Sequence, residues 1–179
     1  MKFDALLKTD SLKQAAHAAE VAERLGFSGV WTNETAHDPF LPLAAAALRT
    51  SHIKRGTSVA IAFPRSPTVA AYTAWDLAQA SGGRFILGLG TQVKAHIERR
   101  FSATWDAPVE RLRDYIGAVR AVWQCWQTGE RLRYESPHSN LKLMTPFSSP
   151  PPMPDPSHIP HIYIPEVNRR LCSLAAEGG

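Results

Sequence analysis

The chain has few cysteines and no long hydrophobic run, and both absences limit what it can be. Its 179 residues include only Cys125 and Cys172, which lack the close spacing of a metal-binding motif. No apolar run approaches the roughly 20 residues that a membrane-spanning helix needs. The N-terminus enters a strand-like pattern without the apolar core of a signal peptide. We therefore expect a cytoplasmic protein that binds no metal, works away from the membrane and keeps both cysteines as buried thiols.

The chain also lacks a large excess of either sign of charge. The formal net charge is +4, from 20 Lys and Arg residues against 16 Asp and Glu residues. The basic residues are scattered, whereas a nucleic-acid surface needs a basic stripe interleaved with exposed aromatic residues. We therefore expect no nucleic-acid partner, while an anionic small ligand remains compatible with the charge.

What the chain does contain is a regular alternation of strand-like and helix-like segments. Short apolar runs typical of buried strands recur along the chain, at residues 3–7, 29–32, 53–61, 85–89 and 162–164. Segments with helical periodicity, a capping Ser, an initial Pro or a final Gly alternate with them, at residues 11–26, 41–48, 67–83, 108–126 and 168–176. The alternation predicts a parallel sheet of βα repeats, either a doubly wound sheet or a (β/α) barrel. Residues 7–10 form no Gly-rich phosphate turn after the first strand, and this favours the barrel.

The alternation is interrupted before the fifth strand. Residues 130–143 predict a short hairpin, and residues 145–160 contain seven prolines, which exclude a helix or an inner strand and indicate a long ordered loop or a mobile lid. A closed (β/α)₈ barrel takes roughly 250 residues, but about five βα units are present here. We expect one domain, residues 1–179, forming an incomplete TIM-type barrel with an insertion at 130–160. A fragment, a barrel completed by association and an open sheet all remain possible readings.

The strand at 85–89 ends in a glycine turn that can approach a ligand closely. Gly90 is followed by Thr91 and Gln92, and then by a basic segment that begins at Lys94. Glycine allows a sharp turn and leaves the backbone amides accessible, as cofactor sites at the carboxyl ends of parallel strands require.

Four segments together resemble one family. Residues 26–34, 56–59, 81–91 and 111–126 have the order and spacing of the luciferase-like monooxygenases, and within them of the coenzyme F420-dependent oxidoreductases. The resemblance covers essentially the whole chain, as the N-terminal part of such a protein. It implies a TIM barrel, commonly a homodimer, that binds flavin mononucleotide (FMN) or F420 at the carboxyl face of the sheet.

The resemblance also implies positions for the cofactor. The matching positions for a non-proline cis peptide behind the cofactor ring are Ser58 and Val59. The turn formed by Gly90, Thr91 and Gln92 corresponds to the contact with the ribityl and phosphate chain. Lys94 lies where it can pair with phosphate, or it simply begins a solvated helix.

Candidate catalytic residues follow the second strand. Glu34 matches an acidic position near the reacting centre, whereas Thr35 stands where relatives carry histidine, so His37 is the candidate proton donor. The alternatives are that Glu34 caps a turn and that His37 lies in a solvated loop. Because side chains alternate along a strand, a Glu34 that faces the barrel mouth would leave Trp31 packed on the helices.

Three further residues have two readings each. Arg65 follows the third strand and either covers an anionic ligand or caps a loop. Met144 and Phe147 border the proline-rich segment and either line a substrate pocket or fasten that segment.

The function implied by the resemblance is hydride transfer between F420 and a small organic substrate. FMN-dependent monooxygenation on the same fold is one alternative. An inactive, truncated paralogue that acts as a partner module is the other.

Overall fold

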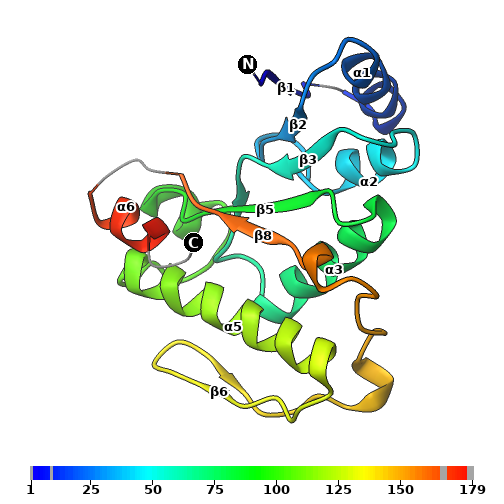
Figure 1. The fold of residues 1–179 in the computed structure, drawn as a ribbon. Helices are drawn as coiled ribbons and strands as arrows, with labels where there is room; N and C mark the ends of the chain where they lie inside the picture. The colour runs from blue at the N-terminus through cyan, green and yellow to red at the C-terminus, as the bar shows by residue number, and fades with distance from the viewer. Residues whose placement is uncertain (1, 9, 166–168, 177–179) are drawn as a thin grey trace.

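A single parallel sheet organises the molecule. The computed structural model describes residues 2–8, 10–165 and 169–176. Within these residues the sheet contains six strands, β1 (Asp4–Leu6), β2 (Gly29–Thr32), β3 (Lys54–Thr57), β4 (Ala60–Ile61), β5 (Phe85–Gly90) and β8 (His161–Tyr163). Their spatial order is β1-β2-β3-β5-β8, which follows the chain, and β4 also pairs with β5 (Figure 1). A doubly wound sheet reverses its strand order, so this order is that of barrel-type βα repeats.

The helices form where local signals begin and end them. Ser11 and Ser66 accept hydrogen bonds from the backbone N–H groups of Gln14 and Val69, which caps two of the helices. The described helices are α1 (Leu12–Arg24), α2 (Leu41–Ala47), α3 (Pro67–Ser81), α4 (Lys94–Arg99), α5 (Pro108–Thr128) and α6 (Arg169–Ala176). The start of α4 at Lys94 agrees with one of the two alternatives given for that residue, and Asn168, the expected start of the last helix, lies outside the described residues.

The two faces of the sheet have different surroundings. Side chains such as Val30 and Leu87 are fully buried against the helices on the outer face. On the inner face, Leu6 is 48% and Tyr163 53% exposed. One face is therefore covered by helices, and the other remains open in this chain.

The expected position of Trp31 was wrong, because its indole lies on the inner face. Its Nε1 donates to Asp4 Oδ2 at 3.0 Å, and its ring stacks on Tyr163 with 6.1 Å between centroids. A Cβ on Gly56 would come 2.4 Å from Trp31 Cζ3, so the missing side chain makes room for the indole. The prediction assumed that Glu34 faces the barrel mouth, and the structure turns its carboxylate the other way.

The predicted third strand is interrupted in its middle. Gly56 pairs with Ile86 and Ala60 with Leu89, so this strand advances four residues over the stretch in which β5 advances three. The extra residue is a β-bulge between β3 and β4. The peptide bond between Ser58 and Val59, which lies in this bulge, is cis, as the resemblance implied.

Charged side chains fasten the turn that precedes β3. The Glu23 carboxylate accepts hydrogen bonds from the backbone N–H groups of residues 51–53. Burial alone would raise the pKa of Glu23, but these three donors lower it overall. Arg55 Nη2 donates to Thr50 Oγ1 at 2.8 Å, and burial together with the charge of Arg84 lowers the pKa of Arg55 to about 10.

The insertion packs on the helix layer. It contains the hairpin strands β6 (Tyr134–Glu135) and β7 (Asn140–Leu141) and the 3₁₀ helices η1 (Pro146–Ser148) and η2 (Pro156–His158). Its proline-rich part is fixed to α3 by Trp75 Nε1, which donates to Pro151 O at 3.3 Å. It is fixed to α5 by Gln127, which exchanges two hydrogen bonds with the backbone of Met153. The segment runs past α3 to β8 (Figure 1), and whether it is an ordered loop or a mobile lid stays a prediction.

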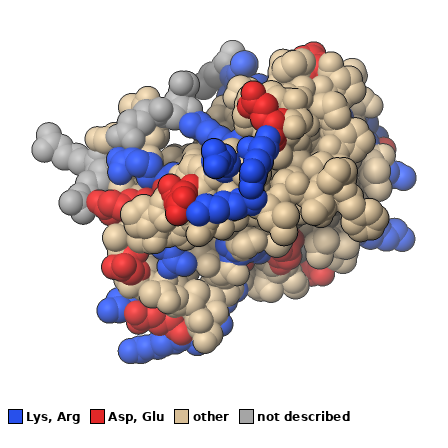
Figure 2. All heavy atoms as spheres, turned by 90° about the horizontal axis from the view of Figure 1, so that it is seen from below, with Lys and Arg blue, Asp and Glu red and all other residues tan. Residues whose placement is uncertain are grey.

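The outer surface of the hairpin carries both signs of charge. Figure 2, seen from below, shows Lys and Arg side chains gathered on this face with Asp and Glu beside them. Arg131, Arg133 and Lys142 line a hollow of about 320 Å³, and Lys142 pairs with Glu135 at 2.9 Å.

The cysteines are both free thiols, with different surroundings. Cys125 is buried as expected, whereas Cys172 is exposed on α6, so that part of the prediction was wrong. Among the described residues, no helix is long and apolar enough to cross a membrane.

Gly88 is the position where β3 and β5 tolerate no side chain. A Cβ there would lie 1.8 Å from the backbone oxygen of Thr57. We expect Gly88→Ala to lower the free energy of unfolding by at least ~2 kcal/mol, because the clash is with backbone. Urea denaturation measures this. In Gly26→Ala the new Cβ meets nothing within 4 Å and only the positive φ is strained, so about 1 kcal/mol is expected. Equal losses in the two variants would contradict the steric explanation.

Candidate active site

The carboxyl ends of β1 and β2 border a pocket of about 530 Å³. Its polar lining comes from the segments that follow these strands, and includes Lys8, Asp10, Asn33 and His37. Parallel strands bring their carboxyl ends to one edge, so two short loops supply all these groups. The sequence interpretation missed Lys8, Asp10 and Asn33. Their only signal was their position just after strands.

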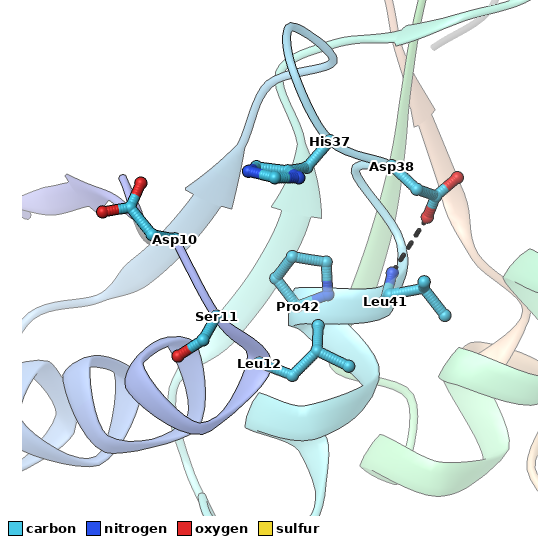
Figure 3. Close-up of a pocket in the computed structure, with 7 residues that line it drawn as sticks. All are labelled: Asp10, Ser11, Leu12, His37, Asp38, Leu41 and Pro42. Carbon is cyan, nitrogen blue, oxygen red and sulfur yellow. Dashed lines mark hydrogen bonds between the residues drawn. The ribbon is translucent and has the colours of Figure 1, made fainter.

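His37 lies between this pocket and a second one. The second pocket has a volume of about 220 Å³ and lies between the first turns of α1 and α2. His37 is exposed on the loop from β2 to α2, and Figure 3 shows its imidazole and the Asp10 carboxylate on opposite sides of the opening. Three ionisable side chains, Asp10, His37 and Asp38, line both pockets and stand where they meet.

Glu34 is turned away from both pockets and is only 7% exposed. Its Oε2 accepts hydrogen bonds from Ile61 N at 2.7 Å and from Arg65 Nη1 at 2.7 Å. Arg65 Nη1 also donates to Ile61 O at 3.0 Å. The carboxylate thus joins the end of β2 to β4.

Arg65 extends this connection to the start of α2. Its Nη2 donates to Asp38 Oδ2 at 3.2 Å, while Asp38 Oδ1 accepts from the backbone N–H groups of Phe40 and Leu41. Burial opposes the charged form of Arg65, but its two carboxylate partners raise the pKa of Arg65 above its ordinary value. The ion pairs of Arg65 with Glu34 and with Asp38 therefore fix both ends of the loop that carries His37. The loop-capping reading of Arg65 is the one that the structure supports.

The cis dipeptide and the glycine turn lie against each other. A Cβ on Gly90 would come 2.6 Å from Val59 Cγ2 and 3.9 Å from Pro165 Cγ. Gly90 is buried, whereas Ser58 is exposed. The structure thus brings together Ser58, Val59 and Gly90, which lie in two separate regions of the sequence.

The residues after Gly90 bond mostly to one another. Thr91 Oγ1 donates to Gln92 O at 3.0 Å, and Gln92, at φ +61°, accepts from Val93 N through its side chain. Lys94 is exposed on α4 and pairs with Glu98 at 3.8 Å. The cofactor role of Thr91, Gln92 and Lys94 stays a prediction.

The comparison with known families decides the affiliation. The sequence matches the model of the luciferase-like monooxygenases over residues 2–179. This chain belongs to that family. The match covers all five strand–helix units described above.

Two curated proteins are similar to this chain. An uncharacterized protein of Mycobacterium tuberculosis is 45% identical over 168 residues, which are 94% of this chain and 49% of that protein. A second protein of the same organism, provisionally named a coenzyme F420-dependent oxidoreductase, is 38% identical over 109 residues, 60% of this chain and 31% of its own length. The chain spans at most about half the length of these curated relatives.

A solved structure shares the fold. It is the oxygenating constituent of 3,6-diketocamphane monooxygenase from Pseudomonas putida, a type II Baeyer–Villiger monooxygenase in complex with FMN. It superposes with a TM-score of 0.76 at 17% identity, covering 92% of this chain and 51% of that one. The chain therefore has the luciferase-like architecture of TIM-type βα repeats, present here as about five units.

The two predicted substrate residues lie in the insertion of this luciferase-like fold. Met144 is half-buried, and its Sδ accepts a hydrogen bond from Trp126 Nε1 at 3.3 Å in the helix layer. Phe147 is fully exposed on η1. Neither lines the two pockets beside His37, and their contact with substrate stays a prediction.

Removing the charge of Glu34 tests the connection that holds the site. We expect Glu34→Gln to lower the free energy of unfolding by about 2 kcal/mol, because a buried charged acceptor loses its ion pair with Arg65. Exchange of the Ile61 amide hydrogen should accelerate in parallel. The matched control is Glu98→Gln, whose exposed pair with Lys94 is worth less than ~0.5 kcal/mol. If both variants are equally stable, the connection does not support the fold.

Proposed function

We propose that this chain takes part in hydride transfer between coenzyme F420 and a small organic molecule, as a homodimer in the cytoplasm without nucleic-acid or membrane partners. The observation that carries the proposal is His37, exposed where two pockets meet at the carboxyl edge of a luciferase-like sheet. The relative named for F420 supports the cofactor.

The residues at this edge fit a planar ring. The side chain of Val59 packs directly on the bare backbone of Gly90, where a Cβ would come 2.6 Å from Val59 Cγ2. Beside them, the hydroxyl group of Ser58 is exposed. We assign the ring to Ser58 and Val59 and the attached chain to Gly90, Thr91, Gln92 and Lys94. When bound, a deazaflavin supplies a ring carbon that accepts or releases a hydride.

The residues of this chain would divide the remaining work. His37 gives or takes the proton that accompanies the hydride, since imidazole is the side chain most often used for proton transfer in catalysis. Glu34 is assigned a positioning role, because its Oε2 is engaged by Ile61 and Arg65 rather than pointing into a pocket. Asp38 completes that support at the start of α2.

FMN-dependent monooxygenation is the second candidate. The FMN-bound monooxygenase described above supports it through its shared fold. A deazaflavin lacks the ring nitrogen through which a reduced flavin reacts with oxygen, so the identity of the cofactor decides between a reductase and a monooxygenase.

A cofactor titration tests the proposal. We expect micromolar F420 to bind the full 179-residue chain with a change in fluorescence, and FMN to bind at least about tenfold more weakly. Gly90→Ala should weaken binding, because the new Cβ displaces Val59, with circular dichroism confirming that the variant folds. Size-exclusion chromatography gives the oligomeric mass. FMN binding alone would favour the monooxygenase, and a monomer that binds neither cofactor would overturn both enzyme proposals.

Replacing His37 tests the proton-transfer role. We expect His37→Asn to lower turnover of any alcohol or ketone that the wild-type chain accepts by about 100-fold, the lower end for loss of general acid–base catalysis. Cofactor affinity should stay within about twofold. His52→Asn is the matched control, since His52 is also exposed but lies in the turn before β3. Unchanged turnover in the His37 variant would show that another group moves the proton.

A further inference from the structure

Two exposed leucines stand at the first positions of neighbouring helices. Leu12 and Leu41 are the first residues of α1 and α2, and they are 48% and 57% exposed. Together with Pro42 they form the apolar wall of the 220 Å³ pocket, which we call the α1–α2 pocket (Figure 3). Exposed apolar side chains gathered in a hollow mark a binding surface.

The α1–α2 pocket is continuous with the pocket at the sheet edge. Both are lined by Asp10, His37, Asp38 and Pro42. In Figure 3 Leu12 and Pro42 lie below the imidazole of His37, Leu41 lies to their right, and the carboxylate of Asp10 lies to the left of the imidazole. A molecule whose apolar part rests on the leucines therefore presents its other end to His37.

The size and charge of this pocket restrict its ligand. An apolar cavity of about 150 Å³ is sufficient for benzene, so about 220 Å³ accommodates a six-membered ring with a small substituent. The Asp10 carboxylate on its rim disfavours an anion, whereas the charge of Asp38 is paired with Arg65 at 3.2 Å.

We propose that the α1–α2 pocket binds the apolar ring or short chain of an uncharged organic substrate and directs the oxygen of that substrate to His37. The substrate class rests on the proposed function, whereas the binding of an uncharged apolar ligand does not. Leu12 and Leu41 would then determine specificity without taking part in the chemistry.

Ligand binding can be measured without turnover. The probes are cyclohexanone and its anionic counterpart cyclohexanecarboxylate, followed by ligand-observed NMR on the full chain. The test variants are Leu12→Gln and Leu41→Gln. The same helices supply the controls, Leu25→Gln and Leu48→Gln, whose leucines are 71% and 81% exposed at the opposite helix ends.

We expect the Kd of cyclohexanone to rise about fivefold in each test variant, the effect of losing ~1 kcal/mol of apolar contact, and to stay unchanged in the controls. Cyclohexanecarboxylate should bind at least about tenfold more weakly than cyclohexanone. Equal effects in test and control variants, or equal binding of both probes, would overturn the proposal. So would a change in oligomeric mass in the test variants without any change in Kd, because the leucines would then contact a second copy.

The two proposals fail separately. If cyclohexanone binds as described but neither F420 nor FMN does, the α1–α2 pocket stands and the oxidoreductase function falls. If a cofactor binds but the leucine variants behave as their controls, the function stands and the specificity pocket falls.

Discussion

The guanidinium group of Arg65 is the point on which the carboxyl edge of the sheet depends. It bonds to Glu34 and Asp38 at the two ends of the β2–α2 loop and to Ile61 in β4, so this loop and β4 share one cation. Two carboxylates compensate the half-buried charge of Arg65, and the other oxygen of Asp38 accepts from the backbone N–H groups of Phe40 and Leu41 at the start of α2. The loop with His37 is short and exposed, yet both of its ends are attached to this network.

The sheet below this edge depends on small residues rather than on charge. Gly56 lets Trp31 lie flat on the inner face, and Gly90 lets Val59 pack on a strand end. At Gly88, Thr57 Oγ1 both accepts from the backbone N–H and donates to the carbonyl, which draws β3 and β5 together. Each glycine thus has a packing reason that is independent of any ligand.

Much of the fold was readable from the sequence because its signals are local. Hydrophobic runs, capping serines and initial prolines marked β2 and α3 to within a few residues, and a family resemblance added the barrel type and the cis bond. The direction of individual side chains was not readable. The position of the Trp31 indole depends on Gly56 in the neighbouring strand β3. The direction of the Glu34 carboxylate depends on Arg65, thirty-one positions later in the sequence. Cys172 lies on a helix whose outward face the sequence alone did not identify. The apolar wall of the α1–α2 pocket was equally hidden, because leucines at helix starts resemble ordinary core positions.

The bulge between β3 and β4 changes the phase of the strand. Side chains of directly paired residues lie on the same face, so Gly56 shares the inner face with Ile86, and Ala60 shares the outer face with Leu89. Gly56 and Ala60 are four residues apart, so in an uninterrupted strand their side chains would lie on one face. The single extra residue therefore divides the strand into two halves of opposite alternation. Before the bulge Gly56 faces the inner side of the sheet, and after it Ala60 is fully buried in the layer that the helices cover.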